Sequence, residues 1–116
     1  MSATERFYIR IDNLGQAEGE DREFAFTGAS PASFAEQFQR GLRERDLFNR
    51  WRDKQEDPDA VPDELSPSDP DATVEATGSD LHTNVVVTTR LPHRVVAHRL
   101  TLLIGPHWTL RDVSKA

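Results

Sequence analysis

Cysteine is absent from the 116-residue chain, and its absence removes two classes of site. Without a thiol there is no disulfide framework and no thiolate metal site. No apolar run approaches the roughly 20 residues that a helix needs to span a bilayer. The first residues, Met1 to Glu5, also lack the basic and apolar regions of a signal peptide. The sequence therefore predicts a soluble protein of the cytoplasm, without membrane partners.

The common catalytic and cofactor-binding motifs are also missing. There is no phosphate loop, no nucleophile elbow, no zinc-binding H-E-x-x-H helix and no glycine-rich strand-to-helix turn. Acidic residues alternate at Asp57, Asp59 and Asp63, as oxygen ligands do in a calcium loop. The required glycine and glutamate are absent, however, and proline interrupts the run. We therefore predict no cofactor, no metal site and no catalytic residue set.

Charge is distributed unevenly along the chain, whose length favours a single domain over residues 1–116. Residues 55–80 hold nine acidic residues and no Lys or Arg, so the net charge of −6 leaves +3 on the remainder. Four prolines fall within residues 56–71: Pro58, Pro62, Pro67 and Pro70. This segment is predicted to be an acidic loop, either a mobile linker or a functional loop, with a short turn at 63–66.

Two alternating segments open the chain. In the first, residues 6–12, Phe7, Ile9 and Ile11 share one side, which is typical of a half-buried strand. Residues 22–27 repeat the pattern with Phe24 and Phe26. We expect these segments to form a long-looped β-hairpin.

A helix is predicted to begin at Ser30 and Pro31, an N-cap residue followed by proline at the first helical position. Ser33 and Glu36 have the spacing of a capping box. Phe34, Phe38 and Leu42 recur at four-residue spacing and form one apolar stripe of this helix.

A second apolar stripe, Leu47, Phe48 and Trp51, lies at an angle of about 135° to the first if the helix is straight. One straight helix cannot place both stripes on one sheet. Either the helix breaks near residues 45–46, with Asp46 capping a short second helix to about Lys54, or it continues and touches neighbours on two sides.

The C-terminal part is interpreted as strands at residues 72–77, 81–91 and 94–104. A turn at Pro92 and His93 would join the last two, with cross-strand partners whose numbers sum to 185. This register places His98 on the apolar face, opposite Val87. Residues 108–116 add a short strand or cover the core with Trp108 and Leu110.

The order ββα(α)βββ predicts an α+β fold: a two-layer sandwich with an approximately five-stranded, mainly antiparallel sheet and one or two helices on one face. The opposite face would be open to solvent and carry Tyr8, Arg10, Arg90 and Arg99. Arginines beside an aromatic ring can receive a carboxylate, a phosphate or single-stranded nucleic acid. With Tyr8 as the single aromatic placed there, a solvated face is the simpler interpretation.

A second candidate surface is the basic helical run around Phe48, Trp51 and Arg52. The aromatic pair either packs under the following loop or anchors a protein partner, with arginines at the rim. In a related hypothesis, the acidic loop folds over this run and leaves it when the partner binds.

Two functions follow from these surfaces. The first is a non-enzymatic binding or adaptor domain that acts on another macromolecule, most simply a protein. The alternative is a small enzyme or small-ligand binder with a pocket between helices and sheet, where His98 would transfer protons and an arginine would hold an anion. His98 among apolar neighbours is also typical of a neutral core histidine.

Overall fold

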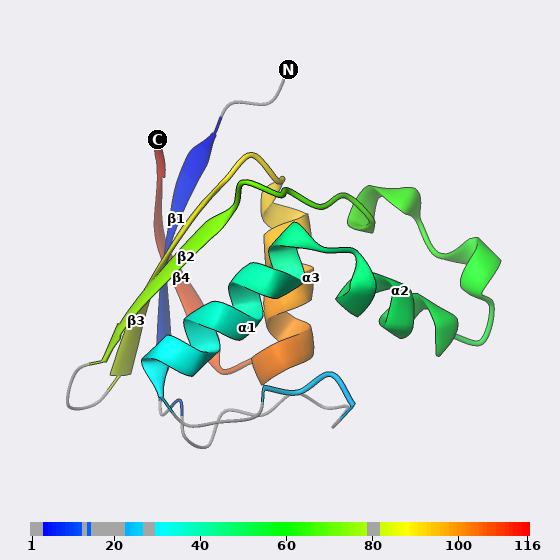
Figure 1. Ribbon diagram of the computed structural model, residues 1–116, viewed down its shortest axis with the longest axis horizontal. Helices are drawn as coiled ribbons and strands as arrows, with labels where there is room; N and C mark the ends of the chain where they lie inside the picture. Colours follow the sequence, from blue (N-terminus) through cyan, green and yellow to red (C-terminus); the bar gives the residue numbers. More distant parts are fainter. Residues whose placement is uncertain (1–3, 13, 15–22, 27–29, 79–81) are drawn as a thin grey trace.

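A computed structural model describes residues 4–12, 14, 23–26, 30–78 and 82–116. The elements, in chain order, are β1 (Glu5–Asp12), α1 (Pro31–Arg43), α2 (Asp46–Asp53), the one-turn 3-10 helices η2 (Pro58–Ala60) and η3 (Asp63–Leu65), β2 (Thr73–Gly78), β3 (His82–Thr89), α3 (His93–Ile104) and β4 (Trp108–Lys115) (Figure 1). The fold is α+β. No helix in these ranges has the length and apolarity needed to cross a membrane.

The four strands form one antiparallel sheet in the order β2-β3-β1-β4. With a helical segment between β1 and β2 and another between β3 and β4, this is the β-α-β-β-α-β arrangement called ferredoxin-like. Helices α1 and α3 cover one face of the sheet (Figure 1). Phe7, Ile9 and Ile11 of β1 point into the resulting core, as the alternation of β1 predicted.

The segment predicted as the last long strand, residues 94–104, is instead the helix α3. Its buried residues recur with helical spacing: Val95, Val96, Arg99, Leu100, Leu103 and Ile104. Pro92 precedes the helix, and Gly105, with a φ of 62°, follows it. Proline before and glycine after a segment is the asymmetry that helices favour. The predicted hairpin with partners summing to 185 is therefore wrong, and the hairpin that forms joins β2 to β3.

The predicted strand at 22–27 is also wrong over the residues that the structure describes there. Residues 23–26 form a turn and a bend. Phe24 and Phe26 are nevertheless buried, and the Phe26 N–H donates to the Leu103 carbonyl at 2.8 Å. Arg22 and Thr27 lie outside the described residues. Because this segment covers the core without joining the sheet, the described residues form four strands, not about five.

The predicted break in the helical segment is confirmed: α1 ends at Arg43 and α2 begins at Asp46. Ser30 caps α1, since its hydroxyl accepts from the Ser33 N–H at 3.1 Å. Glu36 forms an i,i+4 pair with Arg40 in place of the expected capping box. Asp46 is the first residue of α2, not its cap, and binds Arg50 at 3.0 Å.

A buried arginine fastens the proline-rich loop to the helices. Arg99 of α3, expected on the open sheet face, has no exposed surface. Its guanidinium donates to the carbonyls of Gly41 (2.7 Å), Leu65 (3.2 Å), Ser66 (3.2 Å) and Pro67 (2.6 Å). The loop therefore closes over α3 at residues 65–67.

The charge of Arg99 is retained although its acceptors are all neutral carbonyl groups. Burial and the nearby charge of Arg45 lower the pKa of Arg99 to about 10, so the group is protonated at neutral pH. Gly41 lies in the last turn of α1, where the negative end of the helix dipole favours a cation. Arg99 thus acts as a cap for α1 and as the anchor of the loop.

Asp69 anchors the end of the same loop. Its carboxylate is buried and accepts from the Thr89 hydroxyl at 2.8 Å, the Arg90 N–H at 3.2 Å and the Asp71 N–H at 3.0 Å. Its own N–H donates to the Leu42 carbonyl at 2.9 Å. Burial raises the pKa of Asp69, but these hydrogen bonds and the charge of Arg90 outweigh that effect and lower it. Asp69 therefore stays ionised and links α1 to the end of β3.

Replacing Arg99 with methionine keeps the apolar volume but leaves four carbonyl oxygens without their donor. We expect Arg99→Met to lower the free energy of unfolding by about 2–4 kcal/mol and to expose the loop to proteases. Urea unfolding and limited proteolysis measure the two effects. Arg94→Met is the matched control, since Arg94 on the same helix is exposed and pairs with Glu64; its expected effect is within about 0.5 kcal/mol. Equal losses in the two variants would contradict the anchoring role.

Asp69→Asn replaces an acceptor oxygen with a donor among three donating groups. We expect a loss of about 1–3 kcal/mol at pH 7. Because the pKa of Asp69 is lowered on folding, its stabilisation is present above the ordinary value of 3.8 and is lost as the pH falls through the folded value. The difference between wild type and variant should therefore shrink below about pH 4. Urea unfolding at several pH values tests this, with exposed Asp71→Asn as control.

Candidate binding groove between α2, α3 and β4

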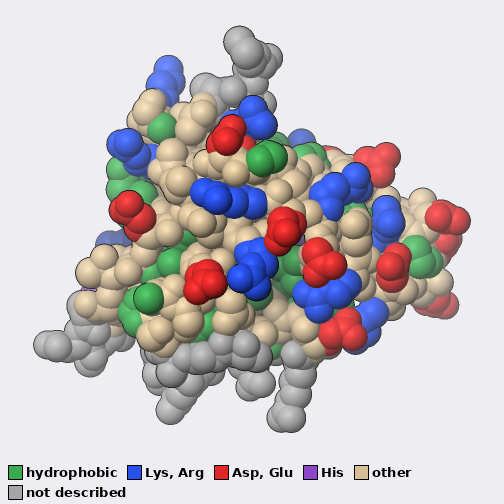
Figure 2. Space-filling model, viewed as in Figure 1, with side chains coloured by type: hydrophobic (Ala, Val, Ile, Leu, Met, Phe, Trp, Pro, Cys, Tyr) green, Lys and Arg blue, Asp and Glu red, His purple; other side chains and the backbone are tan. Residues whose placement is uncertain are grey.

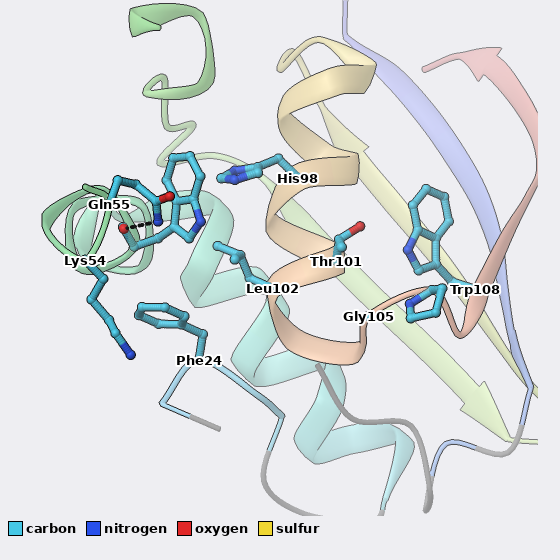
Figure 3. A pocket seen from close by; sticks show the side chains of 10 residues that line it. Phe24, Lys54, Gln55, His98, Thr101, Leu102, Gly105 and Trp108 are labelled. Atoms are coloured by element: carbon cyan, nitrogen blue, oxygen red, sulfur yellow. Dashed lines mark hydrogen bonds between the residues drawn. The ribbon is translucent and has the colours of Figure 1, made fainter. Parts of the chain in front are cut away.

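A half-open groove of about 670 Å³ lies between α2, α3 and the start of β4 (Figure 3). The residues that line it are Phe24, Trp51, Lys54, Gln55, His98, Thr101, Leu102, Gly105, Pro106 and Trp108. Most of its lining is apolar. Its volume lies within the range of roughly 300–1,000 Å³ typical of ligand pockets.

Two helical stripes build the groove. On α3 and its end, His98, Thr101, Leu102 and Gly105 follow the i, i+3, i+4, i+7 spacing that places residues on one helix face. From α2 and the residues that follow it, Trp51, Lys54 and Gln55 line the groove with i, i+3, i+4 spacing. The break between α1 and α2 gives α2 its own direction and thereby places Trp51 beside α3.

Two tryptophans line the groove, Trp51 from α2 and Trp108 from β4. Figure 3 shows Trp108 on the side of α3 that carries Thr101, whereas Leu102 points to the other side of the helix. Both indoles are half-buried and rest against the core. Lys54 lies at the rim near Trp51, with its ammonium 5.2 Å from the Phe24 ring centroid. The groove thus offers broad apolar walls and a few polar groups at its edge.

His98 packs against Trp51 and does not present its nitrogens to the groove. The two rings meet edge to face with centroids 4.4 Å apart, and Phe48 lies 6.5 Å away. Both ring nitrogens are buried, and neither has a hydrogen-bond partner among the described residues. Burial, then the charge of Arg99, lowers the pKa of His98. The imidazole is therefore neutral at pH 7, and its nitrogens do not reach a molecule in the groove.

The two aromatic residues predicted as a partner anchor, Phe48 and Trp51, have different surroundings in the structure. Phe48 is buried, with Trp51 at 5.9 Å and the guanidinium carbons of Arg52 and Arg99 each 5.8 Å from its ring centroid. Trp51 alone of the pair lines the groove. Arg52 is half-buried and lies 3.9 Å from the carboxylate of Asp53.

The basic run around α2 is interspersed with acids from the same helices. Arg40 pairs with Glu36, and Arg50 with Asp46. Figure 2 shows basic and acidic side chains mixed over this face of the molecule. In the acidic loop, Glu64 pairs with Arg94 of α3, and the two charged groups are 2.9 Å apart.

The open sheet face carries only part of the set assigned to it. Tyr8 and Arg10 lie there; the Tyr8 hydroxyl is 3.4 Å from Ser114 Oγ, and Arg10 contacts His82 Nδ1 at 3.1 Å. Arg90 follows the end of β3 and lies 3.4 Å from Asp69, while Arg99 is buried in α3. The arginines therefore do not converge into one anion site.

Most of the groove residues were not indicated as a site by the sequence, among them Phe24, Gln55, Leu102, Gly105, Pro106 and Trp108. The prediction of a strand at residues 94–104 placed Leu102 in the core and His98 beside Val87. The signal that finds the groove is the helical spacing from His98 to Gly105, framed by Pro92 and Gly105.

Within the described residues there is no group of three His, Cys, Asp or Glu side chains able to hold a metal ion. No protein-family model matches this sequence, and comparisons with curated proteins and with solved structures gave no significant match.

Because the pKa of His98 is lowered on folding, the stability contribution of its neutral form should be lost as the pH falls below 6.5 and through the folded value. His98→Phe removes this proton uptake. We expect the wild type to lose stability between pH 7 and pH 5 relative to His98→Phe, as measured by urea unfolding. His107→Phe, at an exposed histidine, should keep the wild-type pH dependence. A wild type and a His98→Phe variant with the same pH dependence would contradict the buried, neutral assignment.

Proposed function

We propose that this domain is a non-catalytic binding module that receives an apolar segment of a protein partner in the groove between Trp51 and Trp108. The observation that carries the proposal is the groove itself, which is lined by Leu102 and by two half-buried tryptophans, Trp51 and Trp108. Tryptophan is among the residues most enriched at the energetic centres of protein interfaces.

The shape of the groove favours a partner chain over a small molecule. Small-molecule sites bury about 70–90% of their ligand. This groove is half-open, so a free ligand would keep much of its surface in water. A side chain on a partner segment needs only one side covered, because the rest of its chain rests on the rim.

Catalysis is less well supported by the same geometry. The alternative function gave His98 a proton-transfer role and an arginine an anion-holding role. The nitrogens of His98 are covered by protein, and Nη1 and Nη2 of Arg99 donate to four backbone carbonyls. A general base must lie within hydrogen-bonding reach of the proton that it removes.

Thr101 provides a test that spares the fold, because its side chain lines the groove and is exposed. A photo-crosslinking residue at position 101 should capture the partner in cells, whereas the same residue at exposed Thr77 of β2 should not. Thr101→Arg should then weaken binding of the purified partner by at least about tenfold, or 1.4 kcal/mol. Thr77→Arg, the matched control, should leave binding unchanged.

A partner whose affinity survives Thr101→Arg would contradict the proposal. A small molecule retained by the native protein in mass spectrometry, and lost in Thr101→Arg, would assign the groove to a small ligand instead.

A further inference from the structure

The two edges of the sheet differ in whether another element covers them. At the β2 edge, the Val74 N–H donates to Gln39 of α1 at 3.0 Å, and Arg43 of α1 donates to the Ala72 carbonyl at 2.7 Å. Helix α1 therefore covers that edge. The β4 strand is the other edge, and within the described part of the chain its strand partner is β1 alone. An uncovered edge strand is a template for pairing with another chain.

Two features of the outer edge of β4 are expected of a strand that pairs with another chain. The Val113 N–H donates to the carboxylate of its own neighbour Asp112 at 2.9 Å, not to a strand. Val113 is also 38% exposed and is the one exposed large hydrophobic side chain among the residues that the structure describes.

A β-bulge gives β4 a symmetrical pattern of faces. Ile9 pairs with Leu110 and Tyr8 with Asp112, so Arg111 is the extra residue. Without it, Leu110 and Val113, three positions apart, would lie on opposite faces. With it, Trp108, Leu110, Val113 and Lys115 share the helix-covered face, and Thr109, Asp112 and Ser114 share the open face.

Two copies of β4 that run antiparallel to each other have complementary side chains at opposed positions. Antiparallel pairing about a two-fold axis between residues 111 and 112 sets Leu110 opposite Val113 and Thr109 opposite Ser114. At the axis, Arg111 of each copy faces Asp112 of the other. Directly opposed residues of an antiparallel pair share a face, which the bulge satisfies here.

The neighbouring registers are unfavourable for two reasons: they oppose like charges, and they pair residues that lie on different faces of the sheet. A shift of one residue sets Asp112 opposite its own copy, or Arg111 opposite its own copy, depending on the direction. Like charges directly opposed destabilise a strand pair. Such a shift also sets Leu110 opposite a residue of the other face.

We propose that two copies of the chain pair through their β4 strands, in the register that opposes Arg111 and Asp112, to form one continuous eight-stranded antiparallel sheet. The interface is isologous, since the same strand contributes both sides. Pairing gives the Val113 N–H a backbone acceptor and releases Asp112 to Arg111 of the second copy. This inference does not depend on the function of the groove.

Charge reversal tests the register. Arg111→Asp or Asp112→Arg creates two like-charge oppositions per dimer and should weaken association at least about tenfold. The double variant Arg111→Asp/Asp112→Arg should restore it. Sedimentation velocity over a dilution series measures the dissociation constant, and circular dichroism confirms that each variant folds. Glu75→Arg, a reversal at an exposed site on β2, should leave association unchanged.

Cross-linking gives an independent readout, because the chain has no cysteine of its own. A mixture of Thr109→Cys and Ser114→Cys proteins should form a mixed disulfide dimer under mild oxidation, whereas either variant alone should cross-link far less. A wild type that stays monomeric at every concentration overturns the proposal. So does a double variant that fails to restore the dimer, or a disulfide that forms equally well in the single variants.

Discussion

The hydrogen bonds of Arg99 are the constraint on which the arrangement of the helices and the loop depends. A buried guanidinium is costly to desolvate, and here no carboxylate neutralises it at hydrogen-bonding distance in the part of the chain that the structure describes. Its stabilisation comes from four carbonyl groups and from the C-terminal end of α1. Those carbonyls belong to segments that are more than 30 residues from Arg99 in sequence, so one side chain joins α1, α3 and the loop.

The groove is a consequence of this arrangement. Arg99 and His98 are neighbours on α3 but point to different surroundings: Arg99 toward the loop and α1, His98 toward Trp51. The Phe48 ring is close to both, with its centroid 6.5 Å from that of His98 and 5.8 Å from the guanidinium carbon of Arg99. Holding α1 and the loop against α3 therefore also holds α2 and brings Trp51 to the groove wall. Burial, and then the charge of Arg99, lowers the pKa of His98, which keeps the ring neutral beneath that wall.

Local patterns predicted the elements whose sequence preference agrees with their burial. The alternation of Phe7, Ile9 and Ile11 identified β1, and Ser30 with Pro31 identified the start of α1. The angle between the two apolar stripes predicted the break before α2. These signals are local, and tertiary packing did not oppose them.

The prediction of secondary structure fails where the same apolar pattern fits both the two-residue period of a strand and the 3.6-residue period of a helix. Residues 93–104 are rich in valine and leucine and alternate well enough to resemble a strand, but their buried side chains follow helical spacing. The misassigned strand moved Arg99 onto a sheet face and His98 beside Val87. The predicted exposure of Arg99 was wrong for a second reason. A charged side chain is expected at the surface, and only the three-dimensional convergence of distant carbonyls explains its burial.

The groove and the open edge of the sheet meet at Trp108, which is both a groove wall and the first residue of β4. In the proposed dimer, Lys115 of the second copy lies opposite Trp108 on the helix-covered face, because the register that opposes Arg111 and Asp112 also opposes these two residues. A cation near an indole ring is attracted to its face. Pairing of the strands would thus add a positive charge at the rim of the groove, at the wall far from Lys54. A partner segment with an apolar side chain and a neighbouring carboxylate would then bind the dimer more tightly than the monomer, and by linkage its binding would favour the paired state.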